Sequence, residues 1–426
     1  MNQPATALNW RKEILLYSIL IMLVGLLFSR VLLSSAIIFF ILVSFVHKNF
    51  LQQLKDFFSS PLLWSMSLLF LIPLVSGLWS EDSAHWLRIM RIKLPLLLLP
   101  LCFAGLKEFR FKDWEKIGWI FILLILGGSG WSIYHYLQDI KAVHAGYLQS
   151  HVIITPLKND HVRFSLLAAI AIFTAIFFFI KKRNDYNTAL KLLLIITIPG
   201  LAAYLHVLAV RTGLLCFYLS LFIFVGWLFW NKKHLARSLA LLFAIIAVPV
   251  ASYFVLPTFK NRVRYFNYDI AFAKKNIYLP GSNDGTRIIS VKAGWDIQQQ
   301  HPWTGVGFGD VETEMGQWYD EHYPQMIPSD KILPSSEWVM YGAAAGWPGF
   351  ILFTCFIMFP FFVKDIRKNI FWWMINLSIA LTYLFDNGLE AQFSVFVHAF
   401  VLLWWWCWLS PISKVQDVQE VKRLNN

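Results

Sequence analysis

Apolar runs long enough to cross a bilayer make up most of this sequence, and they restrict its fold more than any other feature. Short charged breaks separate twelve such runs. A membrane-spanning helix needs ~20 mostly apolar residues. The strands of a membrane barrel are ~10 residues long and alternate in polarity, which these runs do not. The runs lie at about 13–29, 31–46, 61–79, 93–106, 117–139, 163–180, 192–209, 212–230, 238–256, 339–363, 370–386 and 394–410.

The composition agrees with a helical membrane protein. The chain is 58% hydrophobic and 15% charged, with a mean hydropathy of +0.56, whereas about a quarter of the residues in a soluble protein are charged. The first run begins near Glu13 and continues into the second without a small-residue cleavage site, so no cleavable signal peptide is expected. We predict an all-α polytopic membrane protein with about 12 transmembrane helices and one large, partly helical external loop between helices 9 and 10.

The distribution of Lys and Arg predicts the orientation. Breaks on one side, including both chain ends, hold 21 of these residues, and the short breaks on the other side hold 8. Because the richer side stays in the cytoplasm, both termini are predicted there, and the net charge of +12 indicates topology rather than a nucleic-acid partner. The predicted divisions are helices 1–9 in residues 1–256, the external loop in 257–338, helices 10–12 in 339–410 and a cytoplasmic tail in 411–426.

Arg211 is the one formal charge between Leu192 and Trp230. A straight helix over this stretch would be ~58 Å long, about twice the thickness of the hydrocarbon core. The chain must therefore fold back, and the natural turn is at 210–213. An arginine so close to the apolar phase indicates a functional site, although a side chain that reaches lipid phosphates is the alternative interpretation.

The external loop has its own candidate for anion binding. Asn283-Asp284-Gly285 is a turn signal, and Thr286 is a candidate helix cap. The next residue, Arg287, would lie in the first turn of a helix that continues to Gln300. Helix N-termini favour anions, so Arg287 is a candidate phosphate ligand; the alternative is a solvated surface arginine.

Other cations precede predicted spans. His85, Arg88 and Arg91 are three residues apart, so on one helix they would form a polar ridge at the outer face. The alternative is a helix end whose cations meet lipid headgroups. In the segment 159–163, Asp160 is a candidate helix cap and Arg163 a second phosphate candidate.

Three glycines at 305, 307 and 309 look like a nucleotide-binding loop, but the expected strand and the P-loop lysine are both missing. We expect these glycines to allow the backbone to approach another element, or a sugar, closely.

The order of these segments resembles the O-antigen ligase and O-antigen polymerase family, in which about twelve spans carry one large external loop before the last three. The resemblance covers most of the chain. The segments that carry it are Gly77–Ser80 with the acidic pair that follows, His206–Leu215, Trp295–Gly309 with its His-Pro and glycine run, and Leu389–Gln392.

The resemblance implies glycosyl transfer on the outer face of the bacterial inner membrane, with the large loop in the periplasm. The donor would be a glycan on undecaprenyl diphosphate, and the acceptor a hydroxyl of a lipid-linked or lipid A-core sugar. Neither cofactor nor metal ion is expected. Cations must stabilise the departing diphosphate, and by resemblance Arg211 and Arg287 match the arginines that do so.

The histidine expected as the general base is missing from this sequence. Counting back from Gly346 and Gly349 puts Ser335 at its position, followed by Ser336. A serine hydroxyl is not a useful base near neutral pH.

Three interpretations remain open for the base. Glu337 replaces the histidine, although it also suits the first turn of the tenth span, where a helix dipole favours a carboxylate. Alternatively, His301 or His322 approaches from the large loop. In the third interpretation the protein has no dedicated base or no longer catalyses.

Other functions also remain open. A polymerase of the same family would differ from a ligase in its acceptor. A lipid-glycan transporter would place charges mid-span or show internal repeats, and neither pattern is evident. A non-catalytic scaffold for envelope assembly is the remaining alternative.

Overall fold

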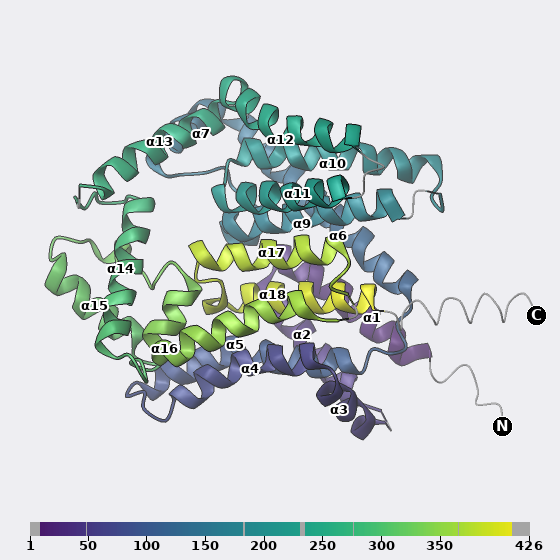
Figure 1. Cartoon of the computed structure of the whole chain (residues 1–426), viewed down its shortest axis with the longest axis horizontal. Helices are drawn as coiled ribbons and strands as arrows, with labels where there is room; N and C mark the ends of the chain where they lie inside the picture. Colours follow the sequence, from purple (N-terminus) through teal and green to yellow (C-terminus); the bar gives the residue numbers. More distant parts are fainter. Residues whose placement is uncertain are drawn as a thin grey trace, which may run out of the picture.

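The computed structural model describes residues 9–47, 49–181, 184–230, 235–275, 277–364 and 366–410, and every regular element in these ranges is a helix. The predicted cytoplasmic tail, residues 411–426, lies outside the described residues. Figure 1 shows the long helices side by side, with α13, α14 and α15 gathered at one end.

Each of the twelve predicted runs coincides with a helix. These helices are α1 (Asn9–Phe28), α2 (Arg30–Phe45), α4 (Pro61–Ser76), α5 (Ser83–Ala104), α6 (Phe111–Gln138), α9 (His161–Lys181), α10 (Thr188–Leu208), α11 (Arg211–Trp230), α12 (Leu235–Val255), α16 (Glu337–Met358), α17 (Ile370–Phe385) and α18 (Gln392–Leu409).

Shorter helices connect them. They are α3 (Phe50–Ser59), α7 (Ile140–Gly146), α8 (Pro156–Asn159), α13 (Pro257–Ala273), α14 (Asp284–Gln300) and α15 (Val311–His322), with 3-10 turns η1 (Tyr147–Gln149), η3 (Pro328–Asp330), η4 (Phe359–Phe362) and η5 (Gly388–Glu390).

Seven of the described helices are long and apolar enough to cross a membrane, or eight if α2 and α3 form one bent span. A multi-pass helical membrane protein is thereby confirmed, but the predicted number of twelve spans is not. Two of the other helices, α4 and α17, have 16 residues each, which corresponds to only ~24 Å. α1 and α5 each contain three charged residues, which interrupt their apolar character.

The helix α5 begins ten residues before the predicted span 93–106. The Asp82 carboxylate accepts a hydrogen bond from the His85 backbone N–H at 2.8 Å and caps the helix. The ridge residues Arg88 and Arg91 therefore do lie on a helix, and both are exposed.

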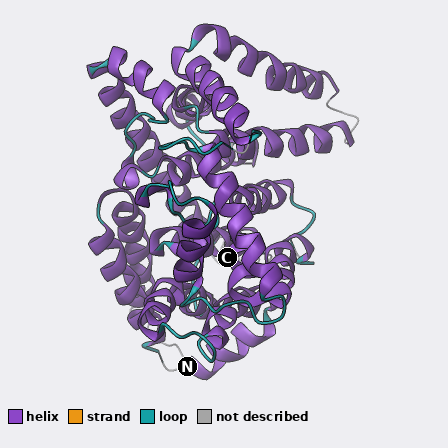
Figure 2. Cartoon of the chain, turned by 90° about the vertical axis from the view of Figure 1, so that its left-hand side faces the viewer, coloured by secondary structure: helices purple, strands orange, loops and turns teal. Residues whose placement is uncertain are grey.

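The described residues between 257 and 338, the segment predicted to be external, form their own layer. In Figure 2 this layer faces the viewer, and loops cross it between helices α13, α14 and α15. The start of α1 and the end of α18 lie at the other end of the bundle (Figure 1). There Arg11 of α1 pairs with Glu108 at 3.3 Å, and Trp404 of α18 donates to the Trp114 carbonyl at 3.4 Å. Which of the two ends is cytoplasmic stays a prediction.

The glycine run fastens the external layer to α16. Gly305 and Gly307 have φ angles of 62° and 92°, which L-residues with side chains rarely adopt. A Cβ at Gly305 would be 2.3 Å from the backbone of Ala344, and one at Gly307 would be 2.3 Å from Ser80 Oγ. Close approach to another element is therefore confirmed.

α16 is kinked where the loop meets it. Gly346 has φ 63° and ψ −161° inside the helix. The loop replaces the backbone hydrogen bonds lost at the kink, because Pro302 O accepts from Trp347 N at 2.8 Å and Gly307 N donates to Ala344 O at 2.9 Å. The loop and α16 thus share one hydrogen-bond network.

Two contacts in the middle of the bundle set the position of the site. α11 packs against α17 through Ser220 and Ser378, whose hydroxyl oxygens are 3.0 Å apart. It packs against α9 at Gly213, where a Cβ would be 2.4 Å from Ser165 Cβ. The first residue of α11, Arg211, therefore lies near the end of α17 and the start of α9.

Candidate functional site

A cavity of about 760 Å³ lies between α11, α12, α13, α14 and α17. Its volume is within the ~300–1,000 Å³ common for ligand pockets. Three arginines line it, Arg211 of α11, Arg262 of α13 and Arg287 of α14. The other lining residues include His161, Asp284 and Ser335 among the polar ones, and Leu214, Leu215, Phe259, Ile288, Val291 and Leu384 among the apolar ones.

Arg211 lies at the turn that the sequence predicts. α10 ends at Leu208, Ala209 takes the left-handed conformation with φ 51°, and Arg211 opens α11. Its guanidinium forms an ion pair with Asp284 of the external segment and lies 4.7 Å from the Phe266 ring centroid. The predicted fold-back is confirmed, and the side chain of Arg211 lines the cavity.

Arg262 is the deepest of the three arginines. Only 5% of the residue is exposed, and its Nε and Nη1 have no hydrogen-bond partner within the described part of the chain. Burial lowers the pKa of Arg262, and the neighbouring Arg211 lowers it further. A buried cation without matched acceptors is costly, so an anionic group in the cavity would be stabilised here.

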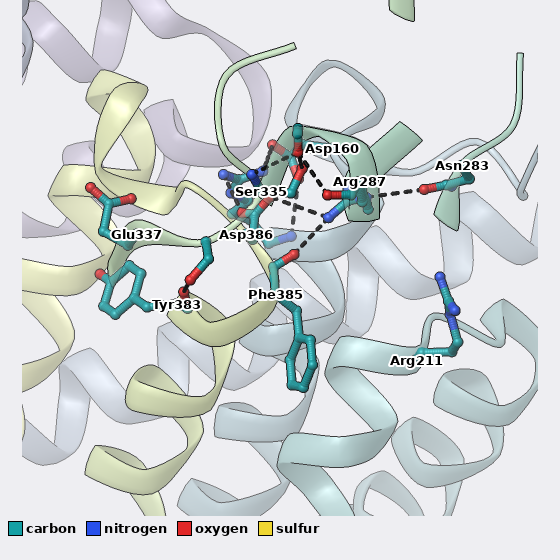
Figure 3. A network of polar contacts seen from close by, with 12 residues as sticks. Asp160, Arg211, Asn283, Arg287, Ser335, Glu337, Tyr383, Phe385 and Asp386 are labelled. Carbon is teal, nitrogen blue, oxygen red and sulfur yellow. Dashed lines mark hydrogen bonds and ion pairs between the residues drawn. The ribbon is translucent and has the colours of Figure 1, made fainter. Parts of the chain in front are cut away.

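Arg287 is held by three neighbours (Figure 3). It donates from Nε to Asn283 Oδ1 at 3.0 Å and from Nη1 to the Phe385 carbonyl at 2.6 Å, and its Nη1 is 3.8 Å from Asp386 Oδ1. These contacts connect the first turn of α14 to the end of α17. Arg287 is therefore oriented by the protein before any ligand binds.

Arg163 does not line the cavity. It forms ion pairs with Asp160, at 3.2 Å, and with Asp386. Burial raises the pKa of Asp386, and the positive charges of Arg163 and Arg287 act against that rise. The predicted cap is confirmed, because Asp160 Oδ1 accepts from Arg163 N at 3.0 Å. Arg163 therefore contacts the site through Asp386.

The N-terminus of α14 differs from the prediction. The helix begins at Asp284 rather than Arg287, and Thr286 lies inside it. Asp269 of α13 accepts hydrogen bonds from the backbone N–H groups of Asp284, at 2.7 Å, and Gly285, at 3.2 Å. The backbone amides at the start of α14 therefore already donate to a carboxylate of the protein. Arg287 itself stays a candidate phosphate ligand.

The serines at the position of the missing histidine lie at two different places. Ser335 lines the cavity, with its Oγ 3.1 Å from Ser290 Oγ of α14. Ser336 is the N-cap residue of α16, and its hydroxyl donates to the Tyr383 carbonyl at 3.4 Å. The position that the spacing from Gly346 and Gly349 assigns to the missing histidine thus lies at the cavity, but Ser335 supplies no basic group there.

Glu337 does not line the cavity. It is fully buried, 3.7 Å from Lys93 Nζ, and its Oε2 accepts from Leu389 N at 3.0 Å. Lys93 also pairs with Glu390 at 2.6 Å. In Figure 3, Asp386 lies between Glu337 and Arg211. Glu337 therefore lies in a buried ion cluster with Lys93 and Glu390.

The other predicted residues lie outside the cavity. His301 is exposed at the end of α14, and His322 stacks on Trp318 with ring centroids 4.2 Å apart. Arg88 and Arg91 do not line the cavity either. Two lining residues, Arg262 and His161, are not among the candidates that the sequence indicates. Arg262 is one of three basic residues within 260–264, and nothing in the sequence distinguishes it from the others.

One stretch of the chain matches a known protein family. Residues 200–354 match the family model for O-antigen ligase. This stretch of the chain is similar to O-antigen ligase. The matched O-antigen ligase region includes the three cavity arginines and Ser335, whereas His161 and Asp386 lie outside it. No curated protein matches the sequence.

Proposed function

We propose that the protein is a membrane glycosyltransferase of the O-antigen ligase type. It would move a glycan from undecaprenyl diphosphate to a hydroxyl of an acceptor sugar. The observation that carries this proposal is the gathering of Arg211, Arg262 and Arg287 on one cavity at the edge of the membrane helices. The match of residues 200–354 to O-antigen ligase supports the same class of substrate, a lipid-linked glycan.

The charge of the cavity suits a diphosphate diester, which carries one negative charge on each phosphate. Three arginines line the cavity against one carboxylate, Asp284. Guanidinium groups form paired hydrogen bonds with phosphate oxygens. In this proposal the arginines supply the positive charge that a metal ion provides in other phosphate sites.

The apolar part of the cavity suits the lipid tail. Along α11 the lining residues run from Arg211 through Leu215 to Tyr218, a distance of ~10 Å into the helix. Pro249 of α12 lines the same region. We propose that the diphosphate binds at the arginines and that the first isoprenoid units lie between α11 and α12.

The reaction is a single displacement in the proposed mechanism. The acceptor hydroxyl oxygen forms a bond to the anomeric carbon, and the bond from that carbon to the diphosphate oxygen breaks. The bonding electrons leave with the diphosphate, whose growing negative charge the three arginines stabilise. The hydroxyl proton goes to a base in the cavity.

We assign the base role to His161. It is the first residue of α9, it is half-buried, and it lines the cavity with the arginines. Imidazole accepts protons near neutral pH, as a serine at position 335 does not. Glu337 instead holds the Leu389 backbone and pairs with Lys93, which supports a positioning role for the segment that follows α17.

The alternatives differ in what happens to the lipid-linked glycan. A polymerase would use a second lipid-linked glycan as acceptor, a transporter would move the donor unchanged, and a scaffold would do neither. Polar residues at the edge of the membrane helices favour chemistry over transport. We further propose that the site faces the periplasm from the inner membrane and that both termini are cytoplasmic.

Purified protein in proteoliposomes tests the proposal. Synthetic undecaprenyl-diphosphate glycan and a lipid A-core acceptor are supplied together, and each alone in parallel. Formation of glycosylated acceptor and free undecaprenyl diphosphate supports the ligase. Glycan lengthening without acceptor indicates a polymerase, and donor movement or binding without bond cleavage contradicts an enzyme.

A further inference from the structure

A second cavity lies at the opposite end of the helical bundle. It has a volume of about 510 Å³ and lies where the start of α4, the connection from α5 to α6, η4 and the end of α18 meet. The start of α1 lies on this side, as the contact between Arg11 and Glu108 indicates. None of its lining residues belongs to the arginine cavity.

The walls of this cavity are mostly apolar. Phe103, Trp114 and Leu62 form its buried side. Phe362 also lines it, and 68% of that residue is exposed. A wall that passes from buried to exposed apolar residues at the end of membrane helices is open to acyl chains.

The mouth is positively charged and carries hydroxyl groups. Lys107 and Lys364 line it with Asp56, Ser59 and Ser60. Asp56 pairs with Lys107 at 2.6 Å, and Lys364 is an exposed lysine at the same mouth. Among the described lining residues, two lysines therefore stand against one carboxylate.

We propose that this cavity binds an anionic phospholipid. Basic pockets between membrane helices on the cytoplasmic side hold anionic headgroups, and the predicted orientation puts this cavity in that leaflet. The phosphate contacts Lys364 and the serine hydroxyls, and one acyl chain lies along Phe103 and Leu62. A lysine reaching past apolar groups to a phosphate suits this geometry.

The nearby helix α3 supports a lipid in this position. It places Leu51 and Phe58 on its exposed surface, beside polar residues such as Gln52 and Lys55. A short helix with apolar and polar exposed residues suits the membrane interface. The site needs no catalytic activity, so the proposal is independent of the glycosyltransferase assignment.

Native mass spectrometry and thermal unfolding test the proposal on the full chain in nanodiscs of phosphatidylcholine with added phosphatidylglycerol. We expect one phosphatidylglycerol to be retained and the midpoint of unfolding to rise until the site is saturated. Lys364→Ala should weaken this binding about fivefold, because one basic residue near an anionic surface contributes ~1 kcal/mol. Ser59→Trp, which narrows the mouth, should remove it.

Lys368→Ala is the matched control, since Lys368 is exposed nearby but does not line the cavity. It should leave retention unchanged. Equal loss in both lysine variants would overturn the proposal in favour of a general surface attraction, and equal stabilisation by phosphatidylcholine would overturn the preference for an anion. Glycerol phosphate should have no effect, and saturation by it would exclude an acyl-chain site.

Discussion

Arg211 and Asp284 are 73 positions apart in the sequence, yet they form an ion pair between a membrane helix and the external segment. Each is the first residue of its helix, α11 and α14. The pair therefore fixes where the external layer meets the membrane helices, and the arginine cavity lies at this junction.

Replacing Arg211 tests the diphosphate role directly. Arg211→Ala removes one cation from the place where charge grows on the leaving group, so glycan transfer should fall by about 10²–10³-fold. Arg237→Ala at the exposed start of α12 is the control and should keep full activity. Transfer at the normal rate by the Arg211 variant would contradict the proposed mechanism.

Arg262 should be as important as Arg211, although the sequence gives no sign of it. Arg262→Ala is expected to reduce transfer by a similar ~10²–10³-fold and to weaken donor binding. Arg264→Ala removes an exposed arginine of the same helix and should change little. Binding of a labelled lipid diphosphate, measured alongside transfer, checks both variants.

The rate of transfer should fall as the solution becomes acidic. An imidazole accepts a proton only while it is neutral, so protonation of His161 would remove the base. His161→Gln should be slow at every pH and should lose the acidic decline. An unchanged pH profile in that variant would assign the base elsewhere.

Charges at Lys93 and Glu337 should act on stability rather than on the chemical step. Lys93→Met leaves the buried carboxylates of Glu337 and Glu390 without their cation, at a cost of about 3–5 kcal/mol. Adding Glu337→Gln and Glu390→Gln should restore much of the unfolding free energy. Glu337→Gln alone should still transfer glycan, and a folded but inactive variant would return the base role to Glu337.

The glycine run should be sensitive to a single methyl group. Gly305→Ala forces a Cβ to within 2.3 Å of the α16 backbone and keeps a φ of 62°. We therefore expect the free energy of unfolding to fall by at least about 1–3 kcal/mol. Gly316→Ala in α15 has open space around its Cβ and should be neutral or stabilising. Thermal unfolding of both variants in the same detergent distinguishes these outcomes.

Sequence reasoning identified the helices and two arginines of the cavity. Hydrophobic runs determine helix positions, because each run must satisfy its backbone internally in lipid. Arg211 was evident from its isolation among apolar residues. Arg262 was not, because it lies among other basic residues and its burial depends on how α13 packs.

The ion cluster and the cap of α14 also needed the fold. Asp269 and Asp284 are 15 positions apart, and the sequence gives no reason to expect the Asp269 carboxylate to accept a hydrogen bond from the Asp284 backbone amide. Glu337 looked like a base because it lies next to the position of the missing histidine. Its partners Lys93 and Glu390 come from distant segments, so its burial with them was not predictable.

The kink of α16 has a consequence for how such proteins can be altered. Because Pro302 and Gly307 supply the hydrogen bonds that the helix lacks around Gly346, the external segment completes a membrane helix as well as carrying part of the cavity. An external segment exchanged from another protein would therefore need to bring the matching α16 with it. Grafted alone, it would leave backbone groups of α16 around Gly346 without their hydrogen-bond partners.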